Sequence, residues 1–118
     1  YDTPGFDTII IATGSEVNLA IKAAKELVLQ GGKVRVVSMP STELFDAQDA
    51  TYKEDILPSK TRRRVAIEMA ATQSWYKYVG LDGAVIGIDI FGASAPAQTV
   101  IDNYGFTVEN IVAQVKSL

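Results

Sequence analysis

The chain has 118 residues, of which 47% are hydrophobic and 21% charged, and its formal net charge is −3. This composition fits one folded domain, excludes a disordered chain, and argues against a nucleic-acid partner because the balance is acidic. The absence of cysteine and histidine excludes a disulfide framework, a thiolate nucleophile, a serine–histidine triad and a histidine zinc site.

Helical patterns separate four predicted strands, each short and rich in valine and isoleucine. Residues 16–30 repeat apolar side chains every three or four positions, and the pair Gly31-Gly32 ends this helix. Residues 41–57 are predicted to form one or two short helices that end before Pro58. The predicted strands are TIIIAT (8–13), KVRVVSM (33–39), RRVAIEM (63–69) and GAVIGID (83–89), all largely apolar on both faces.

Three further helices complete the predicted order. Residues 72–79 carry Trp75, Tyr78 and Val79 on one side, Ser94 caps a helix over 95–104, and Thr107 caps the last one. Strands that alternate with helices indicate a three-layer α/β sandwich with parallel strands, in one domain over residues 1–118. The opening YDTPGFD suggests the tail of a preceding segment, so we expect a larger protein upstream.

The stretch IIIATGSEVNLA (9–20) leads from a strand through a turn into a helix, a geometry that can bind phosphate. The turn has one glycine and no lysine, so it matches neither the P-loop nor the dinucleotide fingerprint. Thr13 and Glu16 instead have the spacing of a capping box, which occupies the amide donors that an anion needs. The turn is therefore interpreted as mainly structural.

The carboxyl ends of the strands are where an open α/β sheet binds ligands. Gly14, Ser15 and Ser41 would lie there and are candidate anion-binding residues. Glu68 and Asp89 would lie at the same edge. They could hold Mg²⁺ or act as acid and base, or could accept backbone N–H groups at strand ends.

Three other motifs allow a structural and a functional interpretation. The basic run KTRRR (60–64) could bind phosphate or an acidic partner, or form a solvated loop before a strand. Trp75, Tyr76 and Tyr78 could form an interface, because aromatic residues are enriched in such contacts, or pack in the core. The LDG sequence (81–83) is interpreted as a turn.

Several segments together resemble the C-terminal domain of transketolase, in the right order and spacing. They are ATGSEV, RVVSMPSTELFDAQD, WYKYVGLDGAVIGIDIFGASAP and GFTVENIV. The resemblance implies a three-layer α/β/α fold with a mostly parallel, mixed, five-stranded sheet. TIIIAT would be central, flanked by KVRVVSM and RRVAIEM, with GAVIGID beyond. The first, antiparallel edge strand would be largely missing, with only Tyr1-Asp2 left.

The resemblance also implies that the catalytic equipment lies elsewhere in the parent enzyme. Thiamine diphosphate and a divalent metal, Mg²⁺ or Ca²⁺, would be bound by other domains. This fragment would hold no cofactor, no metal and no catalytic residue. Its expected partners are the preceding domains of the same chain and, in the parent, a second copy in a homodimer. Because no apolar run reaches the roughly 20 residues that cross a bilayer, we expect no membrane partner.

Our main hypothesis is a non-catalytic, structural and assembly domain of a cytoplasmic transketolase. The full-length enzyme would transfer a two-carbon ketol unit between sugar phosphates in the pentose phosphate pathway. The alternatives are a small anion- or nucleotide-binding regulatory module and, less favoured, an enzyme using Glu68 and Asp89. An exposed apolar patch is expected around the aromatic run 75–78 and along the incomplete edge strand.

Overall fold

The computed structural model describes residues 2–13, 16–39, 42–68, 76–87 and 107–118, with the backbone alone at 42, 68, 76 and 87. The described strands are β1 (Thr8–Ala12), β2 (Val34–Ser38), β3 (Arg63–Glu68) and β4 (Ala84–Gly87). The described helices are α1 (Glu16–Leu29), α2 (Thr42–Asp46), α3 (Ala50–Ile56), α4 (Tyr76–Val79) and α6 (Val108–Ser117). All four predicted strands are present, and 41–57 contains two short helices.

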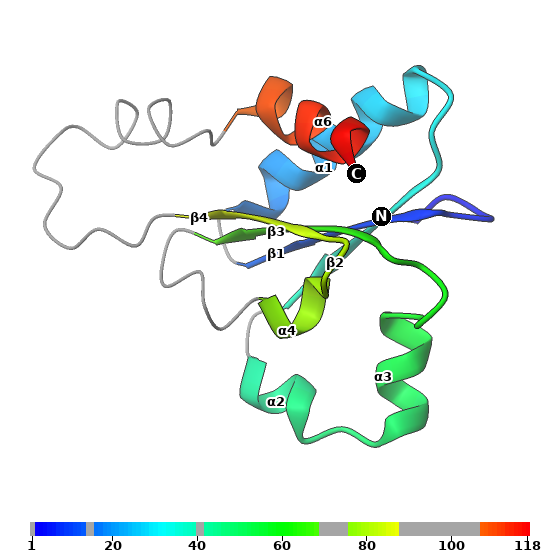
Figure 1. The fold of residues 1–118 in the computed structure, drawn as a ribbon, viewed down its shortest axis with the longest axis vertical. Coiled ribbons are helices and arrows are strands. Elements are labelled where there is room, and N and C mark those ends of the chain that lie inside the picture. The colour runs from blue at the N-terminus through cyan, green and yellow to red at the C-terminus, as the bar shows by residue number, and fades with distance from the viewer. Residues whose placement is uncertain (1, 14–15, 40–41, 69–75, 88–106) are drawn as a thin grey trace, which may run out of the picture.

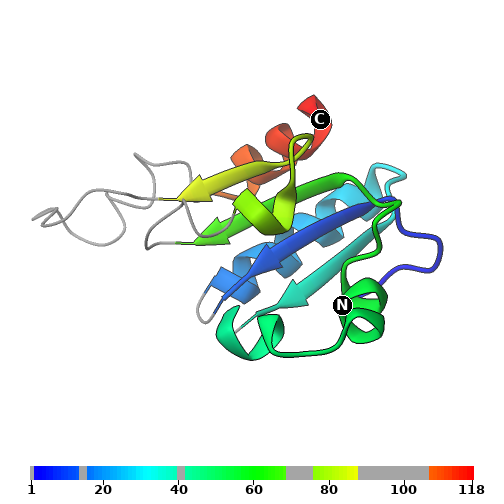
Figure 2. The same cartoon turned by 60° about the horizontal axis from the view of Figure 1, so that its bottom comes forward.

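The strands form one parallel sheet in the order β2-β1-β3-β4, as predicted (Figures 1 and 2). β1 is central and all five of its residues are buried, because strands cover both of its edges and helices cover both of its faces. Ile10 pairs with Val36 on one side and with Val65 on the other. The fold class inferred from the sequence is confirmed.

Helices form a layer on each face of the sheet, α1 and α6 on one and α2, α3 and α4 on the other (Figure 1). Successive side chains of β1 point to opposite faces of the sheet, so they divide the core into two clusters, one beneath each helical layer. Ile10 belongs to the apolar cluster beneath α1 and α6, whereas Ile9 and Ile11 belong to the cluster beneath the other layer. Each cluster is therefore held by one set of helices.

The ends of the α1 and α6 helices follow the sequence signals. Gly31 has a φ of 93°, and the Gly32 N–H donates to the carbonyl of Leu27 at 2.8 Å, so the glycine pair ends α1 as predicted. Thr107 caps α6, because its hydroxyl accepts the Asn110 N–H at 3.1 Å. The predicted helix over 95–104 and most of the one over 72–79 lie outside the described residues.

β2 differs from the expectation that both faces of every strand are covered. Val34 and Val36 are buried under α1, but Arg35 and Val37 on the other face are only half-buried. An isolated antiparallel bridge joins Asp2 to Arg35 on the side of β2 that β1 does not occupy. Asp2 thus lies where the resemblance places an antiparallel strand, while the four described strands are all parallel.

Candidate functional site

A groove of about 470 Å³ lies between β2 and the helices α2 and α3. Val37 and Met39 line it from the strand side, and Leu44, Phe45 and Tyr52 line it from the helices. Leu44 is 66% exposed and Tyr52 is 47% exposed. Because apolar side chains that are largely exposed line this groove, we take it as the candidate site.

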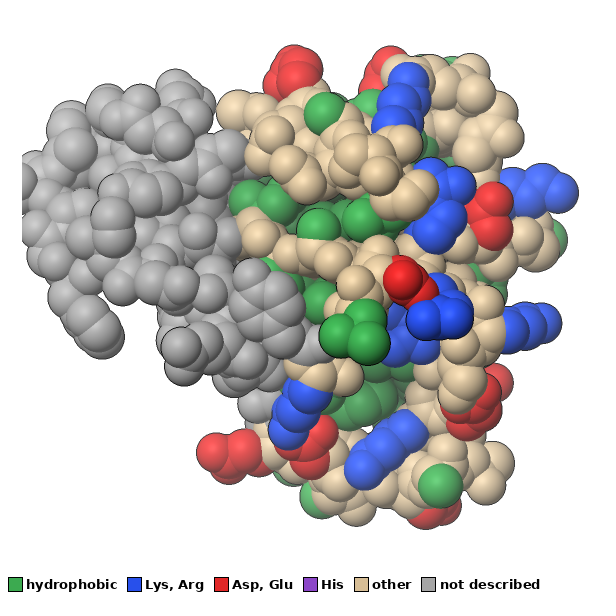
Figure 3. All heavy atoms as spheres, in the orientation of Figure 1, with side chains coloured by type: hydrophobic (Ala, Val, Ile, Leu, Met, Phe, Trp, Pro, Cys, Tyr) green, Lys and Arg blue, Asp and Glu red, His purple; other side chains and the backbone are tan. Residues whose placement is uncertain are grey.

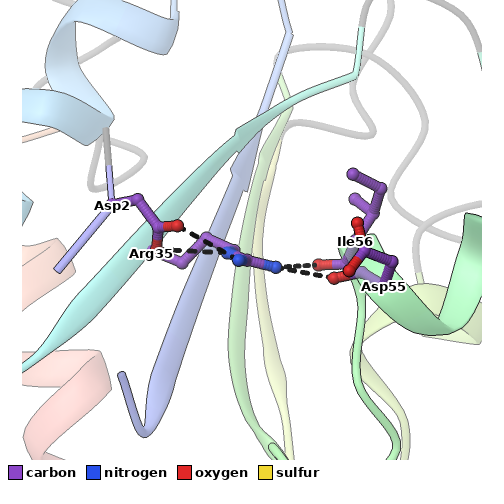
Figure 4. Close-up of polar contacts among 4 residues, drawn as sticks. All are labelled: Asp2, Arg35, Asp55 and Ile56. Atoms are coloured by element: carbon purple, nitrogen blue, oxygen red, sulfur yellow. Dashed lines mark hydrogen bonds and ion pairs between the residues drawn. The ribbon is translucent and has the colours of Figure 1, made fainter. Parts of the chain in front are cut away.

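Arg35 lies at the rim of this groove and joins three segments (Figure 4). Its Nε and Nη2 donate to the two carboxylate oxygens of Asp2 at 3.2 and 3.1 Å. Its Nη1 donates to the backbone carbonyls of Asp55 and Ile56 at 2.7 and 3.2 Å. The guanidinium also lies 4.1 Å from the centre of the Phe6 ring.

These contacts give Arg35 a structural role. A helix leaves its last carbonyls without partners, and a cation there also interacts favourably with the helix dipole. Arg35 therefore binds the C-terminal end of α3 to the sheet and to the segment before β1. The sequence carries one signal for this residue, a lone charge within the apolar run 34–37, and sequence reasoning missed it.

Arg64, from the basic run 60–64, binds backbone carbonyls in the same way. Its guanidinium donates to the carbonyls of Thr61 at 2.8 Å, Tyr78 at 2.7 Å, Pro58 at 2.7 Å and Leu57 at 3.2 Å. Burial lowers the pKa of Arg64, and the negative charge of Glu54 opposes that shift. The side chain is therefore a structural junction within the chain, and not a solvated loop residue.

The other arginines of the run also have partners within the chain. Arg63 donates to the carbonyl of Val115 at 2.9 Å, which joins β3 to the end of α6. Arg62 forms an ion pair with Asp82, and both side chains are more than half exposed. Figure 3, drawn from the same side as Figure 1, shows several basic side chains on the part of the molecule away from the grey residues. Sequence reasoning found the charge and missed that two of the three arginines bind backbone carbonyls.

The described end of the aromatic run connects α4 to α2. Tyr78 is 4% exposed, so this residue follows the core-packing alternative within the chain. Its hydroxyl donates to Asp46 Oδ1 at 2.8 Å, and Lys77 Nζ donates to Asp46 Oδ2 at 2.7 Å. Phe45 packs against the Tyr78 ring edge to face, with 5.8 Å between ring centres.

This small network shifts three pKa values. The hydrogen bonds from Lys77 and then from Tyr78 lower the pKa of Asp46. The hydrogen bond to Asp46 raises the pKa of Lys77. Burial, followed by the hydrogen bond to Asp46, raises the pKa of Tyr78. At neutral pH the network therefore consists of a carboxylate, an ammonium group and a neutral phenol.

Most other sequence-derived candidates lie outside the described residues. The turn before α1 is described at its two ends, where the Glu16 N–H donates to the Thr13 carbonyl at 3.0 Å. Of Glu68 and Tyr76 only the backbone is described, in β3 and α4. The undescribed candidates are Gly14, Ser15, Ser41, Trp75 and Asp89. The anion-binding alternative, the carboxylate pair and the interface role of Trp75 and Tyr76 remain predictions.

The LDG sequence forms a turn between α4 and β4, as expected. The Gly83 N–H lies 3.4 Å from the Gly80 carbonyl. A Cβ at Gly83 would lie 2.5 Å from the carbonyl oxygen of Val79 and 2.7 Å from that of Arg64. The close approach of this backbone explains the glycine, and no ligand is needed to account for it.

A metal–diphosphate site needs several converging oxygen or nitrogen ligands. Within the described ranges, no three residues among Asp, Glu, His and Cys come together. In those ranges, too, no helix has the length and apolar character to cross a membrane.

Comparisons with known proteins agree on one group. The family model described as "Transketolase-like TK C-terminal domain" matches residues 2–107. A probable transketolase of Streptococcus pneumoniae is 73% identical over 113 residues, covering 96% of this chain and 17% of its own length. The structure of transketolase from Leishmania mexicana has a TM-score of 0.89 and 44% identity, covering 99% of this chain and 17% of that one.

A third comparison concerns a shorter relative. A structure described as "Split gene transketolase, inactive beta4 tetramer" has a TM-score of 0.68 and 26% identity. The match covers 98% of this chain and 40% of that one. The chain thus spans about 17% of the length of the relative from Streptococcus pneumoniae and a larger share of this split protein.

Proposed function

The chain belongs to the transketolase family, matching its C-terminal domain, and from this premise we propose that it is a structural and assembly domain without catalytic residues. The observation that carries the proposal is the match of nearly the whole chain to about 17% of the length of a transketolase. Most of such an enzyme therefore lies in other domains. The sequence also lacks histidine, the commonest proton-transfer residue in enzymes.

The whole enzyme in this proposal is a transketolase of the pentose phosphate pathway in the cytoplasm. It moves a two-carbon ketol unit from a ketose phosphate to an aldose phosphate. Thiamine diphosphate, with Mg²⁺ or Ca²⁺, supplies the electron sink for this chemistry when it is bound by the other domains. No step is assigned to the residues of this chain, because in this proposal the reacting groups lie in the other domains.

The partners of the domain are the preceding domains of the same chain and, through the whole enzyme, a second copy in a homodimer. The split-gene relative supports an assembly role without catalytic residues, because that protein contains this fold and is described as an inactive tetramer. The groove beside β2 and the exposed Leu44 and Tyr52 are apolar surface that such contacts could cover.

A pair of assays tests the proposal. The 118-residue chain, mixed with thiamine diphosphate, Mg²⁺ and donor and acceptor sugar phosphates, should produce no ketol transfer. Deletion of the same residues from the full-length protein should lower its dimer content or its thermal midpoint while the cofactor still binds. Ketol transfer by the isolated chain, or loss of cofactor binding with the dimer and midpoint unchanged, would contradict the proposal.

A further inference from the structure

We propose that residues 42–56, which comprise α2, α3 and the residues between them and are called here the helix strap, open from the sheet as a unit about their C-terminal end, while Leu57 and the rest of the domain stay in place. Hydrogen bonds from Lys77 and Tyr78 to Asp46, called here the latch, hold the strap to α4. Arg35 and Arg64 anchor its C-terminal end. This motion is independent of the proposed function. It follows from an unequal distribution of packing and polar contacts along the strap.

The strap contributes little to the core. α3 contains no buried residue. Between residues 43 and 56, only Phe45, Lys53 and Ile56 are half-buried, and all the others are exposed. The groove of about 470 Å³ lies between the strap and β2. Segments with few buried apolar contacts open at a lower free energy than the global unfolding of their domain.

The C-terminal end of the strap is held more firmly. Arg35 binds the carbonyls of Asp55 and Ile56, and Arg64 binds those of Leu57 and Pro58. Hydrogen bonds from a charged donor are stronger than those between neutral groups. Leu57 is also 7% exposed and packs in the cluster beneath this layer. This end therefore stays attached when the helices lift.

The latch is at the end of α2. Asp46 accepts hydrogen bonds from Lys77 and Tyr78 of α4, and Lys53 of α3 is the other charged group that acts on it. The Asp46 and Lys77 side chains are 41% and 60% exposed, so water competes for both. Removing the Tyr78 hydroxyl weakens this latch without changing the apolar ring.

Opening uncovers the apolar face of the sheet. Met39 is 3% exposed and belongs to the cluster against which Phe45 and Ile56 pack. Ile9 and Ile11 belong to the same cluster. When the strap lifts, the groove widens onto this surface, and Met39 becomes accessible. The closed strap thus conceals an apolar surface that partners and reagents reach only in the open state.

Thiol labelling of the full-length protein tests the motion. Met39→Cys places a thiol under the strap, and Ala23→Cys places one at a fully buried position beneath the opposite layer. This chain has no cysteine, so each labelled peptide identifies its site. We expect labelling at position 39 at least about tenfold faster than at position 23, because opening costs less than unfolding. Equal rates would overturn the proposal.

The latch is tested in the same background. Tyr78→Phe should speed labelling at position 39 about threefold or more and leave the rate at position 23 unchanged. The control is Asp82→Ala, which removes the exposed ion pair with Arg62, a contact outside the strap. No effect of Tyr78→Phe, or an equal effect at both positions, would overturn the role of Asp46.

A second measurement tests the opening without introduced thiols, in case Met39→Cys fails to fold. Hydrogen–deuterium exchange is compared between the unaltered protein and Tyr78→Phe. The amides of Ala47 and Gln48, which bond within the end of α2, should exchange several-fold faster in the variant. Those of β1 should not change. Faster exchange in β1 as well would show global destabilisation and contradict a local opening.

Discussion

The helices α2 and α3 are attached to the sheet by different contacts from those of α1 and α6 on the opposite face. α1 and α6 bury a continuous set of aliphatic residues against the sheet, including Leu27, Ile111 and Val115. On the other face, α3 buries none of its residues; Arg35 binds backbone carbonyls at its end, and Arg64 binds those of Leu57 and Pro58, which follow it. Apolar burial makes a layer part of the cooperative core, whereas polar contacts at the ends of helices leave the intervening turns exposed.

The largest expected effect is on the free energy of unfolding, when an apolar side chain in each layer is shortened to alanine. Ile111→Ala, at a residue with 0% exposure, should lower the free energy of unfolding by about 2–5 kcal/mol. Leu44→Ala, at a residue with 66% exposure in the strap, should change it by less than about 0.5 kcal/mol. Urea unfolding of both variants measures the difference. Equal losses would show that the strap belongs to the cooperative core.

The next effect concerns the arginine junction. Arg64→Met keeps the apolar stem and removes the donors that four carbonyls share, so we expect a loss of about 1–3 kcal/mol in unfolding free energy. Arg64→Lys retains the charge but lacks the planar fork, and it should recover only part of the loss. Full recovery by lysine would indicate that charge alone holds the junction.

A smaller effect is expected when the N-terminal cap of one helix in each layer is removed. Thr107 caps α6 and Asp49 caps α3, each by accepting an N–H three residues later. Thr107→Ala should lower the unfolding free energy by about 1 kcal/mol, because α6 is part of the core. Asp49→Ala should mainly speed hydrogen exchange within α3. A global loss as large as that of Thr107→Ala would contradict the difference between the layers.

The packed layer was predictable from the sequence because its signals are local. The apolar spacing of 16–30, the pair Gly31-Gly32 and the cap at Thr107 each act within a few residues, and the structure reproduces all three. The order of the strands followed from the resemblance, and their parallel direction followed from the alternation of strands and helices.

The polar attachments of the strap were not predictable in the same way. Arg35 binds carbonyls 20 and 21 residues away, and every residue has a carbonyl, so no sequence pattern marks the partner. Tyr78 and Lys77 are adjacent in sequence, yet one is buried and the other exposed, and the run 75–78 alone could not assign the two faces. The groove arises from this incomplete packing, which hydrophobic periodicity does not record.

The smallest effect is a pH dependence confined to the strap. Asp46 has a lowered pKa in the folded state, so its contribution is complete above its ordinary value of 3.8 and is lost as the pH falls through the folded value. Lys77 has a raised pKa, so its contribution is complete below 10.5 and is lost as the pH rises through the folded value. Tyr78 behaves in the same direction as Lys77, from an ordinary value of 10.0.

The latch should therefore be intact through the neutral range and weaken at both extremes. Hydrogen exchange of the amides of Ala47 and Gln48, corrected for intrinsic rates, should rise in acid before that of β1. In Asp46→Asn this acid-dependent rise should disappear, because the titrating group is gone, while the basal exchange of α2 is already faster. An unchanged acid profile in Asp46→Asn would assign the effect to another carboxylate, with Glu54 the first to examine, since hydrogen bonds from Ser59 lower its pKa at the other end of the strap.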